Sequence, residues 1–177
     1  MSRVSFPPDG FTLELLDRKH RRKRFASGDL RVDEWLIQKA IGAMEKNTST
    51  TRVLVAASGA VAGYYTLANT ALDVSLVPPE LLGGRPPNKP LPTLTLAWLG
   101  VDRGFAGHGL GTKLFARALA DGVQVLHLVR FVAVIVEALT EANAAWYGKH
   151  GFTPVPGTVG KLYLPATTLL QVVGGEP

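Results

Sequence analysis

The pattern of apolar and polar positions divides the first half of the chain into a strand, a helix and a hairpin. Residues 11–16 alternate imperfectly between apolar and polar side chains and predict a first strand. Apolar positions recur at helical spacing over residues 30–44, directly after Asp29, which can cap the predicted helix. Two apolar runs within residues 52–67 flank a Ser-Gly turn and predict a β-hairpin. Residues 77–92 contain six prolines and are predicted to form one extended loop.

Strands and helices alternate in the second half of the chain. Residues 94–101 predict a central strand, and residues 109–125 predict the helix that follows it. Residues 131–137 are nearly all apolar and largely β-branched, which is typical of a strand covered on both faces. Thr140 is predicted to cap a short helix over residues 141–149. Closing strands are predicted for two further segments, residues 161–165 and 167–173.

The composition narrows the class of protein. The 177 residues predict one domain over residues 1–177, with a flexible tail after about residue 171. The absence of cysteine, with four histidines at no metal-ligand spacing, excludes disulfides and thiolate nucleophiles and predicts no metal site. Residues 1–10 contain no signal-peptide pattern, and residues 123–139 are too short and too charged to span a bilayer. We therefore expect a soluble, cytoplasmic protein with no membrane association.

Positive charge is concentrated in one run near the N-terminus. The chain has a formal net charge of +5. The run consists of Arg18, Lys19, His20, Arg21, Arg22, Lys23 and Arg24. Such a run is commonly a solvated surface, and it also suits the phosphate backbone of a nucleic acid. Composition leaves both interpretations open.

Alternating glycines follow the predicted central strand and open the next helix. Gly107, Gly109 and Gly111 have no Cβ, so the backbone amides around them can approach a ligand closely. The first turn of a helix also leaves N–H groups without partners at the positive end of its dipole. The stretch therefore predicts an anion site for a phosphate or pyrophosphate. A tight turn with no ligand produces the same pattern.

Two motifs lie in order along the second half of the chain. The first has Val101-Asp102-Arg103 as its lead-in, then Gly107, and Gly109 and Gly111 as its small-residue positions. The second consists of four residues at fixed spacing, Ala144, Tyr147, Gly151 and Phe152. Together they resemble the motifs of the GNAT superfamily of acyl-coenzyme A N-acyltransferases.

The resemblance implies a fold, a cofactor and a reaction. The fold is α/β (α+β), with a central mixed, mostly antiparallel sheet flanked by helices and a V-shaped gap after the strand Leu94–Val101. The cofactor is acetyl-coenzyme A (acetyl-CoA), and the enzyme is an N-acetyltransferase. The implied cofactor-binding residues are Leu99, Gly100, Val101, Ala106, Gly107, His108, Gly109, Leu110, Gly111, Thr112 and Asn143.

A narrower resemblance covers roughly residues 25–170. The segments that carry it are Phe25–Leu36, Val61–Leu67 and Leu162–Pro165, which look like parts of the GNAT toxins that acetylate aminoacyl-tRNA. This resemblance implies aminoacyl-tRNA as substrate, a block of translation, a homodimer, and a small DNA-binding antitoxin as partner. The basic side chains predicted to bind tRNA are Arg18, Arg21, Arg22, Lys23, Arg24, Lys39 and Arg85.

The chain departs from these toxins at four positions. Ala106 replaces a glutamine or arginine and Trp98 replaces an arginine, whereas Ser27 and Trp146 are milder changes. Two other functions therefore stay open. One is a GNAT enzyme that acetylates a small amine or a protein N-terminus, and the other is a coenzyme-binding or protein-binding module with weakened catalysis.

Tyr147 is the predicted general acid. Its phenol has an ordinary pKa of about 10 and can protonate a leaving thiolate, whose ordinary pKa is about 8.5. A core tyrosine between helix and sheet is the structural alternative. Neither a histidine nor a carboxylate is placed as a general base, although Glu137 ends an apolar strand. An α-amine, unlike a lysine side chain, is partly neutral near pH 7, so the missing base favours an aminoacyl-tRNA substrate.

Overall fold

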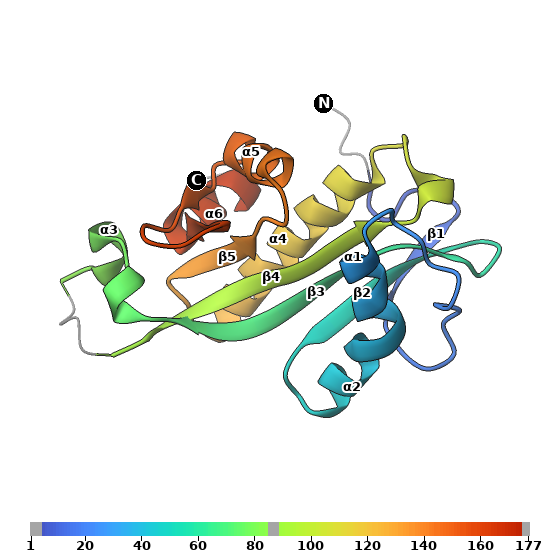
Figure 1. The fold of residues 1–177 in the computed structure, drawn as a ribbon, viewed down its shortest axis with the longest axis horizontal. Helices are drawn as coiled ribbons and strands as arrows, with labels where there is room; N and C mark the ends of the chain where they lie inside the picture. Colours follow the sequence, from blue (N-terminus) through green and yellow to red (C-terminus); the bar gives the residue numbers. More distant parts are fainter. Residues whose placement is uncertain (1–4, 85–88, 175–177) are drawn as a thin grey trace. The chain divides into compact units, whose positions relative to one another are not determined.

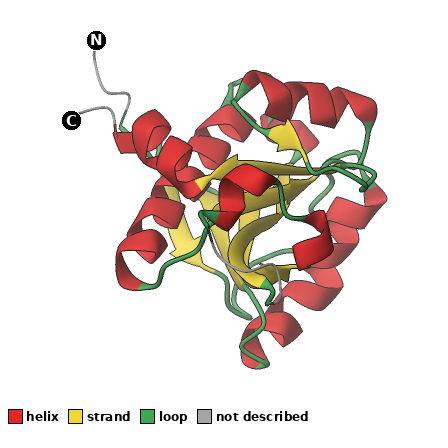
Figure 2. Cartoon of the chain, turned by 90° about the vertical axis from the view of Figure 1, so that its left-hand side faces the viewer, coloured by secondary structure: helices red, strands yellow, loops and turns green. Residues whose placement is uncertain are grey.

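The fold is built on one mixed sheet. The computed structural model describes residues 5–84 and 89–174 (Figure 1). Seven strands form the sheet in the order β1-β2-β3-β4-β5-β7-β6. Figure 2 shows the strands in yellow and the helices in red. Among the strand pairs with a described register, only β4 with β5 is parallel. The predicted mixed, mostly antiparallel α/β architecture is therefore confirmed.

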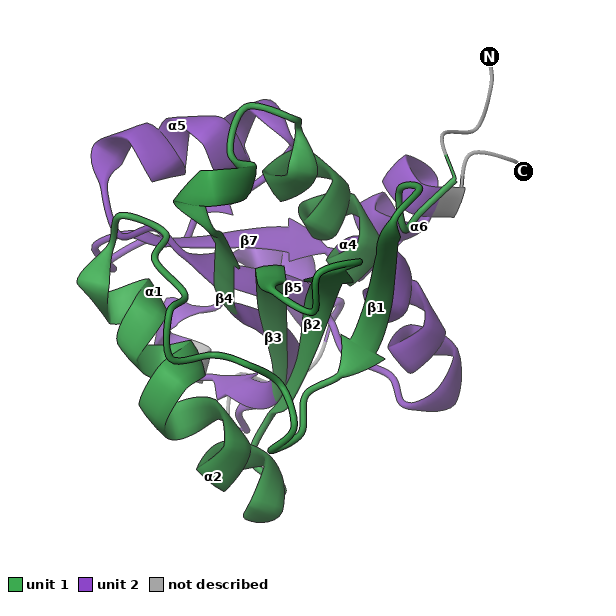
Figure 3. Ribbon diagram, turned by 90° about the vertical axis from the view of Figure 1, so that its right-hand side faces the viewer, with its two compact units in different colours: residues 1–68, 98–118 green, residues 69–97, 119–177 purple. Residues whose placement is uncertain are grey.

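The chain divides into two compact units (Figure 3). Unit 1 contains residues 1–68 and 98–118, and unit 2 contains residues 69–97 and 119–177. Three elements contribute residues to both units, namely β3 (Val61–Leu72), β4 (Leu91–Val101) and α4 (Leu110–Leu128).

β1, β2 and the first part of β3 belong to unit 1, and they confirm the predicted strand and hairpin. β1 (Phe11–Leu15) pairs antiparallel with β2 (Thr50–Ala56), and β2 pairs antiparallel with β3. Leu13 lies opposite Leu54, which in turn lies opposite Gly63. The basic run between β1 and the first helix forms a loop.

The helix predicted over residues 30–44 is present but contains a π-helical turn. It consists of α1 (Leu30–Glu34), the π turn η1 (Trp35–Lys39) and α2 (Ala40–Glu45). Asp29 caps α1 as predicted, because its side chain accepts a hydrogen bond from the Arg31 N–H at 2.9 Å. Periodicity alone gives no sign of the π turn.

Unit 2 is built around β5 (Ala133–Glu137). Four of its five residues are buried, as the apolar run predicts. β5 pairs parallel with β4 and antiparallel with β7 (Lys161–Pro165), which also pairs with β6 (Thr153–Pro154). The β4–β5 register ends at Leu96 opposite Val136, while β4 continues to Val101.

Two short helices lie within the proline-rich connection between β3 and β4. These are the 3-10 turn η2 (Val74–Leu76) and α3 (Pro79–Leu82), which ends at Gly83 with a φ of 56°. Val77 and Leu81 of this connection belong to an apolar cluster of unit 2. The other buried members of the cluster are Leu72, Leu91, Ala133, Ile135, Val155 and Tyr163. The segment is therefore partly helical, where the sequence predicts an extended loop.

The closing strand predicted for residues 167–173 is wrong. These residues lie in α6 (Ala166–Gly174), which follows directly after β7. Thr167 and Thr168 are β-branched and favour a strand in isolation. Leu169 is fully buried in unit 2, and its side chain lies 3.7 Å from where a Cβ on Gly122 of α4 would be. Tertiary packing of a helical face thus outweighs local propensity.

The remaining helices follow the predictions closely. The apolar face of α4 is buried as predicted, at Leu110, Leu114, Phe115, Ala118 and Leu119. α5 (Glu141–Lys149) has the predicted bounds, and Thr140 caps it by accepting a hydrogen bond from the Asn143 N–H at 3.1 Å. Among the described residues, no helix combines the length and apolar character needed to cross a membrane.

Candidate functional site

An exposed glycine turn joins β4 to α4 in unit 1. β4 ends at Val101, the 3-10 turn η3 (Arg103–Phe105) follows, and α4 begins at Leu110. Gly107 and Gly109 have φ values of 83° and 71°, which is the left-handed region that favours glycine. Among the described residues, no atom would lie within 4 Å of a Cβ on either glycine, so the turn is open toward them.

The backbone N–H groups of this turn are unpaired. Within the described part of the chain, no hydrogen bond is made by the N–H groups of residues 107–112. The Lys113 N–H is the first that is paired, with the carbonyl of Gly109 at 3.1 Å. Consecutive open N–H groups at a helix N-terminus form an anion-binding arrangement. The Ala106 N–H already donates to the Arg103 carbonyl at 3.3 Å, so the open N–H groups begin at Gly107.

Close packing within unit 1 fixes the first turns of α4. A Cβ on Gly63 of β3 would lie 2.6 Å from Cδ1 of Leu114 and 3.0 Å from the Gly100 carbonyl oxygen. A Cβ on Gly111 would lie 3.7 Å from the Val101 side chain. The helix can approach the strands this closely because Gly63 has no side chain.

Replacing Gly63 with alanine is expected to lower the free energy of unfolding by about 1–3 kcal/mol, because the added methyl group overpacks the contact with Leu114. The matched control is Gly42→Ala in α2, where a Cβ meets nothing within 4 Å. We expect that control to raise stability by about 0.5–1 kcal/mol, since alanine favours helix. Urea denaturation measures both values, and equal stability of Gly63→Ala and the wild type would contradict the packing argument.

Asp102 anchors the loop before α1 to the end of β4. Its Oδ2 accepts a hydrogen bond from the Ala26 N–H at 3.0 Å, and its Oδ1 accepts one from the Gly104 N–H at 2.8 Å. The Arg103 N–H returns a bond to the Ala26 carbonyl at 2.8 Å. The sequence analysis did not predict this turn, although the Asp-x-Gly pattern of residues 102–104 is typical of one.

Tyr64 holds α1 against the same strand end. Its hydroxyl donates to the Val32 carbonyl at 2.6 Å, and its ring makes an edge contact with Phe25 at 5.5 Å. Burial raises the pKa of the Tyr64 phenol above its ordinary range, and the nearby Asp33 and Asp29 carboxylates raise it further. The phenol therefore stays protonated, and its hydrogen bond is structural.

Tyr147 lies on α5 in unit 2, half-buried. Its ring contacts Phe152 and Trp146 at centroid distances of 5.8 and 5.3 Å. Gly151, with a φ of 93°, reverses the chain so that the Phe152 N–H donates to the Tyr147 carbonyl at 3.2 Å. Burial raises the pKa of the Tyr147 phenol, which keeps the proton on its oxygen at neutral pH.

Comparison with known proteins shows the family. Residues 13–152 match the family described as "Acetyltransferase (GNAT) family". This chain belongs to the GNAT acetyltransferase family. It is therefore an N-acetyltransferase by family, and the predicted GNAT fold is confirmed by solved GNAT structures.

Individual GNAT relatives narrow the comparison. A tRNA-acetylating toxin of Mycobacterium tuberculosis is 30% identical over 132 residues, which cover 75% of this chain and 78% of the relative. The structure of AtaT complexed with acetyl-methionyl-tRNAfMet is 25% identical, with a TM-score of 0.80 over 92% of this chain and 98% of that one. AtaTR bound with acetyl-CoA is 26% identical, with a TM-score of 0.81 over 93% of this chain and 98% of the other.

The glycine turn of this GNAT chain fits a pyrophosphate group such as that of acetyl-CoA. The fit rests on its open N–H groups and on the empty space where side chains of Gly107 and Gly109 would lie. Other predicted cofactor residues are spread over two units. Leu99 and Gly100 lie in unit 1 at the end of β4, whereas Asn143 is exposed on α5 in unit 2.

Several of the cations predicted to bind tRNA already have partners within the protein. Arg18 pairs with Glu45, Lys39 pairs with Glu34 at 3.4 Å, and Arg21 donates to the Ser58 carbonyl. Arg22 donates to the carbonyls of Leu36 and Ile37 at 3.1 and 3.2 Å, which ties it to the π turn. Arg85 lies outside the described residues. For these five residues, tRNA binding stays a prediction.

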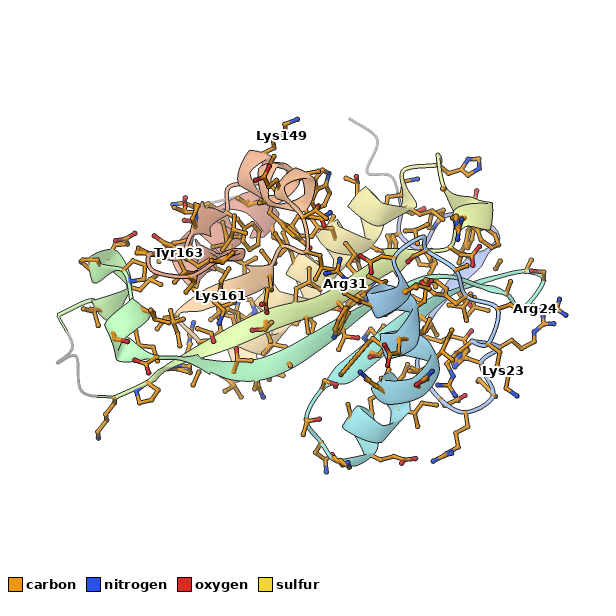
Figure 4. All side chains as sticks on the ribbon, in the orientation of Figure 1. Lys23, Arg24, Arg31, Lys149, Lys161 and Tyr163 are labelled. Atoms are coloured by element: carbon orange, nitrogen blue, oxygen red, sulfur yellow. The ribbon has the colours of Figure 1, made fainter. Side chains whose placement is uncertain are left out.

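Lys23 and Arg24 differ from the other members of the basic run. Both are exposed, and within the described residues neither makes an ion pair or a side-chain hydrogen bond. Figure 4 shows both side chains extending away from the ribbon. They are the members of the run best suited to contact an external polyanion.

The structure also describes the candidate general base, the possible metal ligands and one buried histidine. Glu137, the carboxylate considered as a general base, is exposed at the end of β5. Over the same residues, histidine, aspartate and glutamate form no group of three that could hold a metal ion. His20 is buried and accepts a hydrogen bond from the Asp17 N–H at 3.0 Å, so its role in the loop is structural.

Proposed function

We propose that this protein is a cytoplasmic toxin that transfers an acetyl group from acetyl-CoA to the α-amine of aminoacyl-tRNA and so blocks translation. The observation that carries the proposal is its likeness to AtaT, whose structure contains acetyl-methionyl-tRNAfMet, over 92% of this chain. The name of the mycobacterial relative supports the same reaction. An acetylated α-amine cannot attack a peptidyl ester, so the modified aminoacyl-tRNA cannot be used in elongation.

The donor side uses main-chain groups of unit 1. The N–H groups of residues 107–112 would bind the pyrophosphate, with Ala106 at the edge of this turn. The main-chain groups of Leu99–Val101 would bind the amide-rich arm of the coenzyme, and Asn143 would add a polar contact. When bound, acetyl-CoA supplies the acetyl group as a thioester with a thiolate leaving group.

Tyr147 is the proposed general acid. Its phenol oxygen holds a proton at neutral pH, because burial raises its pKa. It would donate this proton to the departing sulfur as the C–S bond breaks and the new C–N bond forms. The amine loses one proton in forming the amide, and that proton, passed through solvent, would restore the neutral phenol. We propose a single catalytic domain over residues 1–177.

The pH dependence follows from these two groups. Tyr147 acts in its protonated form, and a pKa raised above about 10 keeps that form dominant up to about pH 9. The acceptor amine acts in its neutral form, and an α-amine has an ordinary pKa of about 7.7–8.0. We expect kcat/KM, measured from about pH 6 to 9, to rise to a plateau. A fall between about pH 8 and 9 would contradict the assignment of the acid.

Lys23 and Arg24 are the proposed centre of the tRNA contact, with Arg18, Arg21, Arg22, Lys39 and Arg85 as further contacts. The double change Lys23→Glu and Arg24→Glu is expected to weaken tRNA binding and to reduce the slope of log K against log salt by about 0.7–0.9 per lost contact. The matched control is Lys46→Glu with Arg130→Glu, two exposed cations outside the predicted set. Filter binding at several salt concentrations measures both slopes, and equal slopes would contradict this placement.

The proposal includes two protein partners. These are a small DNA-binding antitoxin and a second copy of this chain in a homodimer. Co-expression with the neighbouring open reading frame, followed by light scattering of the purified protein, tests both.

One experiment separates the proposed function from its alternatives. Labelled acetyl-CoA is offered with aminoacyl-tRNA, uncharged tRNA, free amino acids, polyamines and a peptide with a free N-terminus. The proposal predicts that label enters aminoacyl-tRNA alone. Label in free amines or peptides only would favour a small-amine or N-terminal acetyltransferase. Binding of acetyl-CoA with no transfer to any of these acceptors would favour a module with weakened catalysis.

A further inference from the structure

Two tryptophans of unit 1 form a stacked pair beside the end of β4. The rings of Trp35 and Trp98 are 5.5 Å apart between centroids and inclined by 15°. Both residues are only half-buried, so part of the pair faces solvent. A partly exposed pair of stacked indoles offers a rigid apolar surface for a ligand.

Neighbouring groups fix the orientation of Trp35. Its Nε1–H donates to Thr66 Oγ1 at 3.0 Å, and Thr66 Oγ1 shares a further hydrogen bond of 2.7 Å with Thr51 Oγ1. Both threonines are fully buried. The π turn begins at Trp35, and Arg22 donates to two of its carbonyls. Single π turns within helices are frequent at functional sites.

The pair lies on the face of β4 opposite the start of α4. Side chains two residues apart on a strand share a face, so Trp98 shares the face of Gly100. A Cβ on Gly100 would lie 2.5 Å from Cγ1 of Val32, which places α1 on this face. Val101 points to the other face, where its side chain would lie 3.7 Å from a Cβ on Gly111 of α4. The glycine turn and the tryptophan pair therefore approach the strand end from opposite faces.

We propose that Trp35 and Trp98 contact the side chain of the aminoacyl group and select apolar amino acids over charged ones. This inference rests on the proposed function. The attacking amine must reach a thioester held beside Leu99–Val101, and the amino-acid side chain is attached to the carbon that bears this amine. Trp98 lies one residue before that segment. Because a strand rises about 3.3 Å per residue, its Cα lies close to the segment. The terminal adenine is separated from the amine by the ester and the ribose.

The surface chemistry sets the direction of selection. Apolar or aromatic side chains gain contact area on the indole rings. A charged side chain loses hydration there without gaining a charged partner from the pair.

The test uses the full chain and one tRNA charged in turn with phenylalanine, leucine, lysine and aspartate. We expect wild-type kcat/KM to favour the two apolar groups by tenfold or more. Trp98→Ala should lower kcat/KM for the apolar groups by tenfold or more and change it less than threefold for the charged groups. Trp98→Phe should restore most of the preference. Acetyl-CoA affinity, measured for each variant, is expected to stay unchanged.

The outcomes separate this inference from the proposed function. Equal loss on all four aminoacyl groups with Trp98→Ala would overturn the inference, because contact with the terminal adenine or a purely structural role would act on every substrate alike. A wild-type preference for charged groups would overturn it as well. Absence of transfer to any charged tRNA by the wild type would overturn the proposed function and this inference with it.

Discussion

Replacing Tyr147 with phenylalanine is expected to lower kcat for acetyl transfer by about 10²–10³-fold. The change removes the hydroxyl proton and keeps the ring contacts with Trp146 and Phe152. The leaving thiolate must then take its proton from water, which has no fixed position in the reaction. Acetyl-CoA affinity should change by less than about twofold, because the ring and the glycine turn are retained.

The matched control for this prediction is Tyr163→Phe. Tyr163 is buried on β7, and its hydroxyl donates to Glu80 of α3. Burial, together with this hydrogen bond, raises the pKa of Tyr163 to about 12. The proposed reaction does not use this residue. Single-turnover kinetics should show near wild-type rates for Tyr163→Phe. Near wild-type rates for Tyr147→Phe would remove Tyr147 from the mechanism.

Replacing Gly107 with valine is expected to weaken acetyl-CoA binding by about 100-fold or more. Gly107 has a φ of 83°, which a β-branched residue adopts only at a cost of about 1–2 kcal/mol or more. The turn would relax to negative φ and redirect its N–H groups, or else the new side chain would occupy the space above them. Either change removes the open N–H groups that the pyrophosphate requires.

Gly10→Val provides a closely matched control. Gly10 also has a φ of 83°, and a Cβ there likewise meets nothing within 4 Å. Both variants therefore carry a similar backbone strain, but only Gly107 lies in the proposed cofactor turn. Titration calorimetry should show cofactor binding lost in Gly107→Val and kept in Gly10→Val. Retention of full affinity in Gly107→Val would place the pyrophosphate elsewhere.

Local signals made much of the fold predictable. The helix after Asp29 and the helix capped by Thr140 were predicted from a capping residue followed by a helical sequence. The π turn at Trp35 was not predictable from periodicity, which does not report that Arg22, in the loop before the helix, donates hydrogen bonds to two of its carbonyls. α6 was missed for a related reason, since burial of Leu169 outweighs the strand propensity of its threonines.

The sequence predicted the motifs of the candidate site. It did not predict which of the site's N–H groups and cationic side chains already have partners within the protein. The glycine spacing and Tyr147 indicated where to look, but only the structure shows that the N–H groups of residues 107–112 are open. The basic run illustrates the limit most clearly. The sequence cannot distinguish Arg18, already paired with Glu45, from Lys23 and Arg24, which extend away from the ribbon (Figure 4).

The most direct test of the central claim is to locate the transferred acetyl group. The purified protein is incubated with acetyl-CoA and aminoacyl-tRNA, the RNA is digested with nuclease, and the 3′-terminal aminoacyl-adenosine is analysed by mass spectrometry. We predict that the acetyl group lies on the α-amine of the aminoacyl residue and that uncharged tRNA remains unmodified. An acetyl group on a nucleobase or on a free amine, with the aminoacyl-adenosine unmodified, would contradict the account.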